Sequence, residues 1–402
     1  MNLAIFSPHE DIGDYTNRNL IYSRWAQKKK INSTIYVSNF NYKTKKKKKL
    51  QNFFYEKDNY KNIEIFRIYS NAFKKNGIGR LFSYIIFSFL SLFIFFFIDK
   101  KKYHFIVGES VPPIISFAAY LCSIKQNAKF VYQIRDPWPL SIVYSGLMNR
   151  KSLVFIFFEA INKFLIKKAK FIISVLPYLN FHYRKTYNYT KRIYYLRNPA
   201  EVDNFKPSKY PKIHDKIKVI FAGGFTPSFK ILNYFKAIKY IQQNKKVFSF
   251  SYYFLGTGSD FNKCYSFAKS NNLKDTYFLK SRSKNEVLNF ISDCHLCMAV
   301  VSNNKNCKFG YNLNKMIDYS VCGRPIIFTN NLKKNRFVED YKMGFNTSPL
   351  PREIASKLIL FKNLSFLKKK QMGLNARNFA IKELNIKKLY KKYCKAFYEN
   401  NI

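Results

Sequence analysis

Phe309-Gly310-Tyr311-Asn312-Leu313-Asn314-Lys315-Met316-Ile317-Asp318-Tyr319-Ser320-Val321-Cys322-Gly323-Arg324-Pro325-Ile326-Ile327 is the most informative stretch of this chain. It predicts a loop, a helix over 312–321 and a buried strand over 325–328, with Gly323 ending the helix and Pro325 opening the strand. The N-terminus of a helix offers unpaired N–H groups and a positive dipole end to an anion. Asp318 lies six residues after Asn312, about 9 Å further along a helix axis. That is roughly the distance from a diphosphate to a ribose.

Short apolar runs alternate with helical stretches along the whole chain. In the first half we expect strands at 3–6, 33–38, 62–67, 104–107, 129–134, 171–174 and 192–195, and helices near 15–29, 80–98, 113–126, 152–168 and 177–187. After a proline-containing segment the pattern restarts, with strands near 217–222, 249–255, 275–278, 296–301 and 325–328, and helices near 229–243, 260–271, 284–292 and 312–321. Such alternation builds parallel sheets with helices on both faces. We therefore predict an α/β chain of two doubly wound, Rossmann-like domains, 1–198 and 199–380, that face a central cleft.

Further motifs follow one another in a fixed order. They are Arg18 to Val37, Ile106-Val-Gly-Glu-Ser-Val-Pro-Pro113, Gln133-Ile-Arg-Asp-Pro-Trp-Pro139, Asn198-Pro199 with Asp203 and Phe205, Phe221-Ala-Gly-Gly224 with Lys230, Phe254-Leu-Gly-Thr-Gly258, and Phe278-Leu279 with Ser283 to Leu288. Together with 309–327, their order and spacing resemble the family 4 retaining glycosyltransferases, in particular the branch that builds O-antigen and capsule polysaccharides. The resemblance covers nearly the whole chain.

The resemblance implies the GT-B fold, in which a last helix packs back on the first domain. Ile386 to Tyr398, within 381–402, is the candidate for that helix. It also implies transfer of a sugar from a nucleotide diphosphate, such as a UDP-N-acetylhexosamine, to a lipid-linked or growing glycan acceptor, with retention at the anomeric carbon. Retaining enzymes of this family are thought to react by front-face attack assisted by the leaving phosphate, so no carboxylate pair is required.

The candidate donor-binding residues follow the strands of the second half. They are Gly223, Gly224, Lys230, Gly256, Gly258, Arg282, Gly310, Tyr311, Asn312, Asn314, Lys315 and Asp318. A departing diphosphate gains negative charge, so its site needs cations and N–H donors. Lys230 at the start of a helix, Arg282 and Lys315 could supply the charge, and the Asp318 carboxylate could accept from ribose hydroxyls. Alternatively Lys230 is a solvated lysine, Asp318 is an exposed helical acid, and the glycines at 256 and 258 form only a turn.

Two positions depart from the pattern of the family. Gly224 stands where an arginine is common, and Gly310 stands where many members have the first of two glutamates. Backbone N–H groups of Gly310 to Asn312 are expected to hold the donor instead, and Asn314-Lys315 resembles the Asn-Lys pair of the capsule branch. The departures also favour an alternative, a non-catalytic homologue that serves as a binding or assembly subunit.

Polar residues also end two strands of the first half. Glu109, Arg135 and Asp136 are the catalytic candidates, and Ser110 is an acceptor-binding candidate together with Glu159 of the helix 152–168. Arg135 and Asp136 could instead form an ion pair that fixes the loop, and Glu159 could support packing.

Composition limits the partners. Lys plus Arg total 71 against 23 acidic residues, a net charge of +48 that would suit a polyanion. Compositional drift towards Lys, Asn, Ile, Phe and Tyr, an anionic membrane surface and nucleic acid are the alternatives. Since no zinc-finger spacing or RNA-recognition aromatic motif occurs, we expect no nucleic-acid partner.

The cysteines argue for a reduced compartment. Seven cysteines, an odd number that includes Cys307, suit a cytoplasmic protein better than a disulfide scaffold. The lone CxxC of Cys294 and Cys297 is a weak metal signal, because it lies at the start of a predicted buried strand. We expect no metal and no cofactor beyond the nucleotide-sugar co-substrate. Met1 to Phe6 reads as a strand rather than a signal peptide.

Leu81 to Ile98 is a run of 18 residues without a charge. It is flanked by Lys74, Lys75 and Arg80 on one side and by Asp99 and Lys100 to Lys102 on the other. A membrane-dipping or interfacial hairpin, a buried helix and a membrane span are possible readings. A span would separate strands 3–6 and 105–107, which one sheet needs, so we favour an interfacial segment on a protein held at the inner face of the cell membrane. The lysine run 45–49 reads as a solvated loop or as a contact with lipid headgroups.

Overall fold

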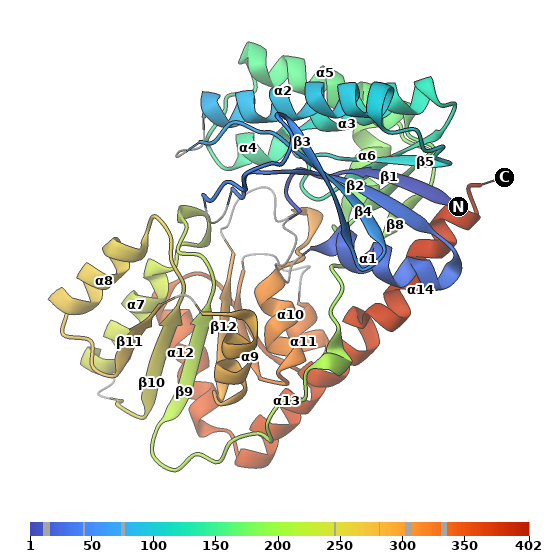
Figure 1. Cartoon of the computed structure of the whole chain (residues 1–402). Helices are drawn as coiled ribbons and strands as arrows, with labels where there is room; N and C mark the ends of the chain where they lie inside the picture. The colour runs from blue at the N-terminus through green and yellow to red at the C-terminus, as the bar shows by residue number, and fades with distance from the viewer. Residues whose placement is uncertain are drawn as a thin grey trace. The chain divides into compact units, whose positions relative to one another are not determined.

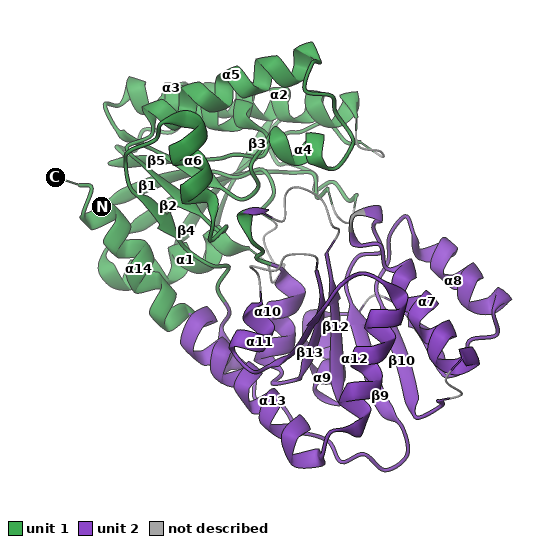
Figure 2. Cartoon of the chain, turned by 180° about the vertical axis from the view of Figure 1, so that it is seen from behind, with its two compact units in different colours: residues 1–199, 309–312, 386–402 green, residues 200–308, 313–385 purple. Residues whose placement is uncertain are grey.

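A computed structural model describes residues 1–10, 17–42, 45–73, 77–244, 247–280, 282–301, 308–330 and 336–401. Lys74, Lys75 and Cys307 therefore lie outside the described residues. The chain forms two compact units (Figures 1 and 2). Unit 1 consists of residues 1–199, 309–312 and 386–402, and unit 2 of residues 200–308 and 313–385.

Unit 1 is built on an eight-stranded sheet in the order β3-β4-β2-β1-β5-β6-β7-β8. The strands are β1 (Asn2–Phe6), β2 (Asn32–Ser38), β3 (Tyr55–Tyr60), β4 (Ile63–Ile68), β5 (Phe105–Glu109), β6 (Lys129–Ile134), β7 (Phe171–Ser174) and β8 (Ile193–Tyr195). All neighbours pair in parallel except β3, which is antiparallel to β4. β3 was not expected from the sequence, because Tyr-Glu-Lys-Asp-Asn-Tyr has no apolar run. Charged residues of this kind are typical of a strand at the edge of a sheet.

Helices cover both faces of this sheet. They are α1 (Arg18–Ala26), α2 (Ile78–Phe93), continued by a π-helical turn (Ile94–Ile98), α3 (Pro113–Lys125), α4 (Leu140–Tyr144), α5 (Leu153–Lys168), α6 (Leu179–Tyr187) and α14 (Ile386–Tyr398). Side chains alternate along β1: Ala4 and Phe6 join the core formed with α2, α3 and α5, whereas Leu3 and Ile5 join the core formed with α1 and α14. The last long helix of the chain thus packs on the first sheet.

The uncharged run 81–98 forms one continuous helix, not a hairpin. It is long and apolar enough to cross a membrane by length and composition, but 39% of that stretch is buried inside the protein. Phe95, for example, packs among Phe6, Tyr36 and Tyr103. The helix connects β4 to β5, and both strands belong to the same sheet. The segment is therefore an integral helix of unit 1 with one exposed side.

Unit 2 is built on a six-stranded, fully parallel sheet in the order β11-β10-β9-β12-β13-β14. The strands are β9 (Ile217–Ala222), β10 (Phe250–Leu255), β11 (Thr276–Leu279), β12 (Leu296–Val300), β13 (Ile326–Thr329) and β14 (Gly344–Thr347). The helices are α7 (Leu232–Lys239), α8 (Phe261–Ser270), α9 (Lys284–Ser292), α10 (Asn314–Val321), α11 (Phe337–Asp340), α12 (Pro351–Asn363) and α13 (Phe366–Phe379). Helices α7, α8 and α12 share the core on one face of the sheet. The predicted fold class, two doubly wound Rossmann-like domains, is confirmed.

Candidate functional site

Two glycine loops meet at the carboxyl end of the sheet of unit 2. They follow β9 and β10, and the Phe225 N–H donates to the Thr257 carbonyl across them at 2.8 Å. A Cβ on Gly256 would lie 2.0 Å from the Gly223 oxygen, and one on Gly258 would lie 2.2 Å from the Phe225 oxygen. Both glycines have positive φ angles, so only glycine allows the loops to approach this closely. The structure thus gives Gly256 and Gly258 a packing role that supports the loop of Gly223 and Gly224.

Lys315, in the first turn of α10, lies directly beside Gly223. Its Nζ would be 3.1 Å from a Cβ at that glycine, and it lies 4.2 Å and 4.0 Å from the ring centroids of Phe221 and Phe229. The side chain is only 9% exposed, and Nζ has no hydrogen-bond partner among the described residues. Burial lowers the pKa of Lys315 to about 7. A buried ammonium without a counter-charge is costly, so this position is suited to an anion supplied from outside the chain.

The orientation of α10 is fixed by a buried tyrosine. The Tyr319 hydroxyl accepts from the Ala222 N–H at 2.9 Å and donates to the Met298 carbonyl at 3.0 Å. These groups belong to the adjacent strands β9 and β12. Because residues four apart lie on the same side of a helix, the contact that fixes Tyr319 also directs Lys315 to the glycine loop.

Asp318, the expected ribose ligand, is a paired carboxylate and not an exposed helical acid. It forms an ion pair with Lys284, and both side chains are 19% exposed. Burial raises the pKa of Asp318, while Lys284 acts in the opposite direction. Lys284 begins α9, directly after the Ser283 of a Ser283–Glu286 capping box. Sequence reasoning missed Lys284, although it lies within the motif 283–288.

The start of α10 also corrects the expected geometry. The helix begins at Asn314, not at residue 312, so Asp318 lies four residues, or about 6 Å, beyond its first residue. Asn314 itself is exposed. The expected distance of 9 Å from Asn312 therefore does not apply.

Gly310, Tyr311 and Asn312 belong to unit 1 and not to the N-terminus of α10. The Tyr178 N–H donates to the Phe309 carbonyl at 3.1 Å, and a Cβ on Gly310 would lie 2.4 Å from the Pro177 ring. Gly310 also has φ +85°. No larger side chain fits there, which gives a packing reason for a glycine where the family pattern has a glutamate.

The two other predicted cations are exposed. Lys230 has φ +45° and follows the short turn Pro227–Phe229, so it precedes α7 instead of opening a helix. The Arg282 guanidinium lies 5.5 Å from the Phe290 ring centroid. Of the predicted residues in unit 2, the structure thus brings Gly223, Gly256 and Lys315 together, with Gly224 and Gly258 in the same two loops.

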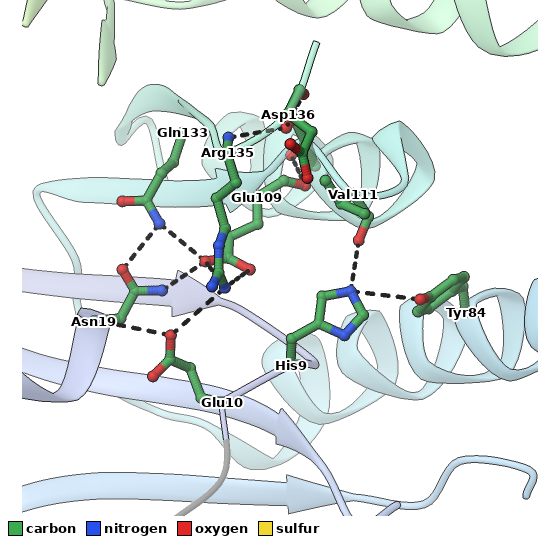
Figure 3. Close-up of polar contacts among 11 residues, drawn as sticks. His9, Glu10, Asn19, Tyr84, Glu109, Val111, Gln133, Arg135 and Asp136 are labelled. Carbon is green, nitrogen blue, oxygen red and sulfur yellow. Dashed lines mark hydrogen bonds and ion pairs between the residues drawn. The ribbon is translucent and has the colours of Figure 1, made fainter. Parts of the chain in front are cut away.

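A buried polar cluster occupies the carboxyl ends of β1, β5 and β6 in unit 1 (Figure 3). Glu109 is fully buried and accepts from Asn19 Nδ2 at 2.8 Å, Gln133 Nε2 at 3.0 Å and Arg135 Nη1 at 3.3 Å. Burial alone would raise the pKa of Glu109, but Arg135 and the hydrogen-bond donors hold it below its usual range. The Glu109 charge in turn raises the pKa of Arg135. Glu109 is therefore a buried carboxylate that holds the Arg135 side chain, and its catalytic role stays a prediction.

Asp136 does not serve as the ion-pair partner of Arg135. The Arg135 guanidinium lies 3.3 Å from Glu109 and 3.9 Å from Glu10, whereas Asp136 is exposed. Ser110 Oγ donates to the Asp136 carbonyl at 3.1 Å, so the expected acceptor residue Ser110 also ties the two strand ends together.

His9 and Glu10 complete the cluster and were missed by the sequence analysis. Burial lowers the pKa of His9 to about 4, and its Nε2 lies 3.0 Å from the Val111 oxygen. Burial and the nearby Glu109 raise the pKa of Glu10. Both residues follow β1, so the rule that singled out polar residues after β5 and β6 would have found them.

Glu159 is a residue of α5 and contacts Tyr187 of α6 in unit 1. One carboxylate oxygen accepts from the Tyr187 hydroxyl at 2.9 Å, and burial raises the pKa of the acid. This contact fits the packing alternative.

The CxxC motif is part of the core. Cys294 and Cys297 are buried, and the Cys294 thiol donates to the Phe290 carbonyl at 3.2 Å. Within the described ranges, no group of three or more His, Cys, Asp and Glu residues could hold a metal ion.

No protein-family model and no curated protein matches the chain. Several solved structures do. The sucrose-phosphate synthase of Thermosynechococcus elongatus has a TM-score of 0.74 at 12% identity, covering 99% of this chain and 98% of the other. Anabaena HepE in complex with UDP and glucose has a TM-score of 0.67 at 11% identity over 99% and 100%. A trehalose-6-phosphate synthase studied for glycosyl transfer with retention has a TM-score of 0.71 at 8% identity over 99% of both chains. At these identities the likeness concerns the fold, and the fold of this chain is that of the GT-B glycosyltransferases.

Proposed function

We propose that this protein is a glycosyltransferase that uses a UDP-sugar, such as a UDP-N-acetylhexosamine, as donor. One observation carries the proposal: the Lys315 ammonium is buried beside Gly223 and has no hydrogen-bond partner within the described ranges. A diphosphate is the group that this position suits, because it brings the missing counter-charge and can accept from nearby backbone N–H groups.

The same residues suit the chemistry of sugar transfer. As the bond between the sugar and the diphosphate breaks, negative charge accumulates on the departing phosphate, and Lys315 would stabilise it in a largely desolvated setting. Asp318, one turn further along α10, is proposed to accept from the ribose hydroxyls, with Lys284 holding its carboxylate in place. The chemistry needs no additional nucleophile if the acceptor attacks on the face from which the diphosphate leaves.

Several finer assignments belong to the proposal. They are membership of family 4 and its O-antigen and capsule branch, retention at the anomeric carbon, independence of metal ions, and a lipid-linked or growing glycan acceptor. The motif order in the sequence supports the family, its branch and the acceptor, and the lack of an Asp-x-Asp pair in the sequence supports metal independence. Retention is supported by a similar structure that was studied for transfer with retention. We further propose that the enzyme works in the cytoplasm at the inner face of the cell membrane.

A non-catalytic binding subunit is the competing function. It was suggested by the glycines at 224 and 310, but Gly310 has a packing reason of its own, against Pro177. Gly224 has no such packing reason, since a Cβ there would lie 3.5 Å or more from its nearest neighbours among the described residues. The competing function therefore rests on Gly224 alone.

Calorimetry with UDP, ADP and GDP, followed by assays of UDP-sugar hydrolysis and transfer with and without EDTA, tests the proposal. We expect UDP to bind, Lys315→Ala to abolish binding, and the matched change of the exposed Lys230→Ala to have a small effect. Turnover that survives EDTA would support metal independence. Binding of UDP without turnover of any UDP-sugar would favour the binding subunit, and equal affinities in wild type and Lys315→Ala would remove the diphosphate from this position.

A further inference from the structure

The helical layer of α2, α3 and α5 in unit 1 has an apolar outer side. The three helices lie next to one another and share the core on one face of the sheet (Figure 1). α2 and the π-helical turn that continues it bury Phe87 together with Ser88 and Ser91, but expose Phe82, Phe89 and Phe97 by 55%, 68% and 63%. An ordinary surface helix turns its polar side to water, whereas this one exposes phenylalanine rings.

The apolar surface continues onto α5. Leu153, Ile156 and Phe157 are all largely exposed on this helix, and Ile124 is exposed at the end of α3 between α2 and α5. Monomeric soluble proteins rarely leave apolar surface of this extent uncovered. The surface therefore needs a partner.

A lysine-rich loop runs beside α2. Near the N-terminus of α2, Lys45 lies close to Arg80, and the Nζ of Lys45 is 4.5 Å from the Phe73 ring centroid. Near the C-terminus of α2, the ring centroids of Phe54 and Phe93 are 5.5 Å apart. The chain from Lys45 to Phe54 thus follows the helix from its N-terminal to its C-terminal part. All five lysines from 45 to 49 are exposed.

The loop also has a hollow of about 480 Å³ and an exposed aromatic tip. Lys47, Lys49 and Tyr69 are among the residues that line the hollow, together with Phe53, which is 95% exposed. Lys47 Nζ lies 3.8 Å from the centroid of the Tyr69 ring, so its ammonium group makes a cation–π contact while the residue remains exposed.

We propose that the apolar side of the α2–α3–α5 layer and the lysine loop 45–49 together dock on an anionic phospholipid bilayer, with α2 lying in the plane of the membrane. An apolar helix surface bordered by basic residues is the pattern that binds at a lipid interface. Glu159 is the only acid in these three helices, and it is half-buried against Tyr187, whereas Arg80, Lys125 and Lys168 contribute positive charge.

The sheet topology excludes a membrane span for α2. The helix leaves from β4 and returns to β5, and the intervening positions in the sheet are occupied by β2 and β1. A span would place β4 and β5 on opposite sides of a bilayer and break this sheet. An in-plane helix needs no change in the fold.

Sedimentation with vesicles tests the proposal, using phosphatidylcholine alone and phosphatidylcholine with 30% phosphatidylglycerol, at low and high salt. Wild type should bind the anionic vesicles best at low salt. The triple change Phe82→Ser, Phe89→Ser and Phe97→Ser should lower binding at least tenfold at both salt concentrations. The triple change Lys45→Gln, Lys47→Gln and Lys49→Gln should lower binding to anionic vesicles about fivefold per lysine at low salt, and much less at high salt.

Two matched controls test whether the position of the lysines and apolar residues matters, or only their number. Lys388, Lys391 and Lys392 are exposed on α14, which packs on the opposite face of the same sheet, and their change to Gln removes the same charge. Leu350, Leu367 and Leu374 are exposed in unit 2, and their change to Ser removes comparable apolar surface. Both control variants should bind vesicles as wild type does.

Three outcomes would overturn the proposal. They are a wild-type protein that ignores anionic vesicles, controls that lose binding as strongly as the test variants, and a lipid-free dimer that the phenylalanine changes disperse. Should the serine variant not fold, Phe89→Trp fluorescence quenched by brominated lipid provides an independent measurement, and lack of quenching would count against the proposal. UDP calorimetry on the same variants keeps this test separate from the donor site, because the proposal does not depend on nucleotide binding.

Discussion

Two cations, the partly exposed Arg135 in unit 1 and the buried Lys315 in unit 2, lie at the carboxyl ends of parallel strands but in opposite electrostatic settings. Arg135 is paired with Glu109, which is itself held by Asn19 and Gln133. Among the described residues, Lys315 has two aromatic rings beside it and no hydrogen-bond partner. The first charge is compensated by Glu109, whereas the second has no compensating group in the part of the chain that the structure describes.

The difference distinguishes a charged side chain with a structural role from one that is suited to bind a ligand. A charge that the fold neutralises can be kept for architecture, while an uncompensated buried charge costs stability and is retained where a ligand recovers that cost. The two sites should therefore respond in opposite ways to mutation.

The largest expected effect is at Lys315. We expect Lys315→Met to weaken UDP binding by about 100-fold or more, because the diphosphate loses its buried counter-charge. The same change should stabilise the protein. The folded-state pKa of Lys315 is lowered to about 7 against about 10.4 in the unfolded chain, so holding the proton costs folding free energy below pH 7, and this cost fades as the pH rises from about 7 towards 10.

Calorimetry and thermal unfolding measure both consequences. At pH 6 the gain in unfolding free energy should be about 2–4 kcal/mol, and at pH 10 it should nearly vanish. The exposed Lys230→Met serves as control and should change neither quantity much. A Lys315→Met variant that is less stable at pH 6 would mean that the ammonium is compensated after all.

Glu109→Gln should have the opposite signature. Removing the carboxylate leaves the Arg135 guanidinium without its partner, and we expect unfolding free energy to fall by about 3 kcal/mol with unchanged UDP affinity. Combining it with Arg135→Met should recover part of the loss, because the uncompensated cation is then gone. Denaturant unfolding of the two single variants and the double variant gives the coupling energy. Coupling near zero would contradict a paired structural charge.

Asp318→Asn should produce a smaller effect. If the carboxylate accepts from the ribose, UDP affinity should fall about tenfold, the cost of losing charged hydrogen bonds. Binding of 2′,3′-dideoxy-UDP, which lacks both hydroxyls, should be the same in wild type and variant. An equal loss for both nucleotides would place the effect in the Lys284 pair and not in ribose recognition.

The fold could be predicted from the sequence because it follows from local patterns. Apolar runs such as Ile217–Ala222 and glycine-terminated turns recur at intervals that only alternating strands and helices satisfy. Two of the missed elements are strands that carry no such pattern. β3 has charged edge residues, and β14 is the short run Gly-Phe-Asn-Thr. The helices α12 and α13 were also missed, although α12 buries Ile354, Leu358 and Phe361 at helical spacing.

The site could be predicted only in part, because contacts between side chains that are far apart in the sequence are not indicated by any local motif. Gly223 and Lys315 were both named from motifs, but nothing in the sequence indicates that they touch. Two further features likewise depend on tertiary packing. One is the ion pair of Asp318 with Lys284, and the other is the set of three hydrogen bonds that the Glu109 carboxylate accepts. The packing of Gly310 on Pro177 brings together residues that are more than a hundred positions apart.

Proton uptake on UDP binding is the smallest expected effect and the most direct test of the Lys315 charge. With a pKa of about 7, Lys315 is mostly neutral at pH 8 in the free protein, and a bound diphosphate would raise that pKa and draw a proton from the buffer. UDP affinity should accordingly fall by up to about tenfold per pH unit above 7. Titration calorimetry at pH 8 in buffers of different ionisation enthalpy should show uptake approaching one proton, at a pH where the terminal phosphate, whose pKa is about 6, is already ionised. Lys315→Arg, whose guanidinium keeps its proton, is the matched control and should bind UDP without uptake. Equal uptake in wild type and Lys315→Arg would assign the proton to another group, and no uptake in either would mean that Lys315 is already charged before the nucleotide binds.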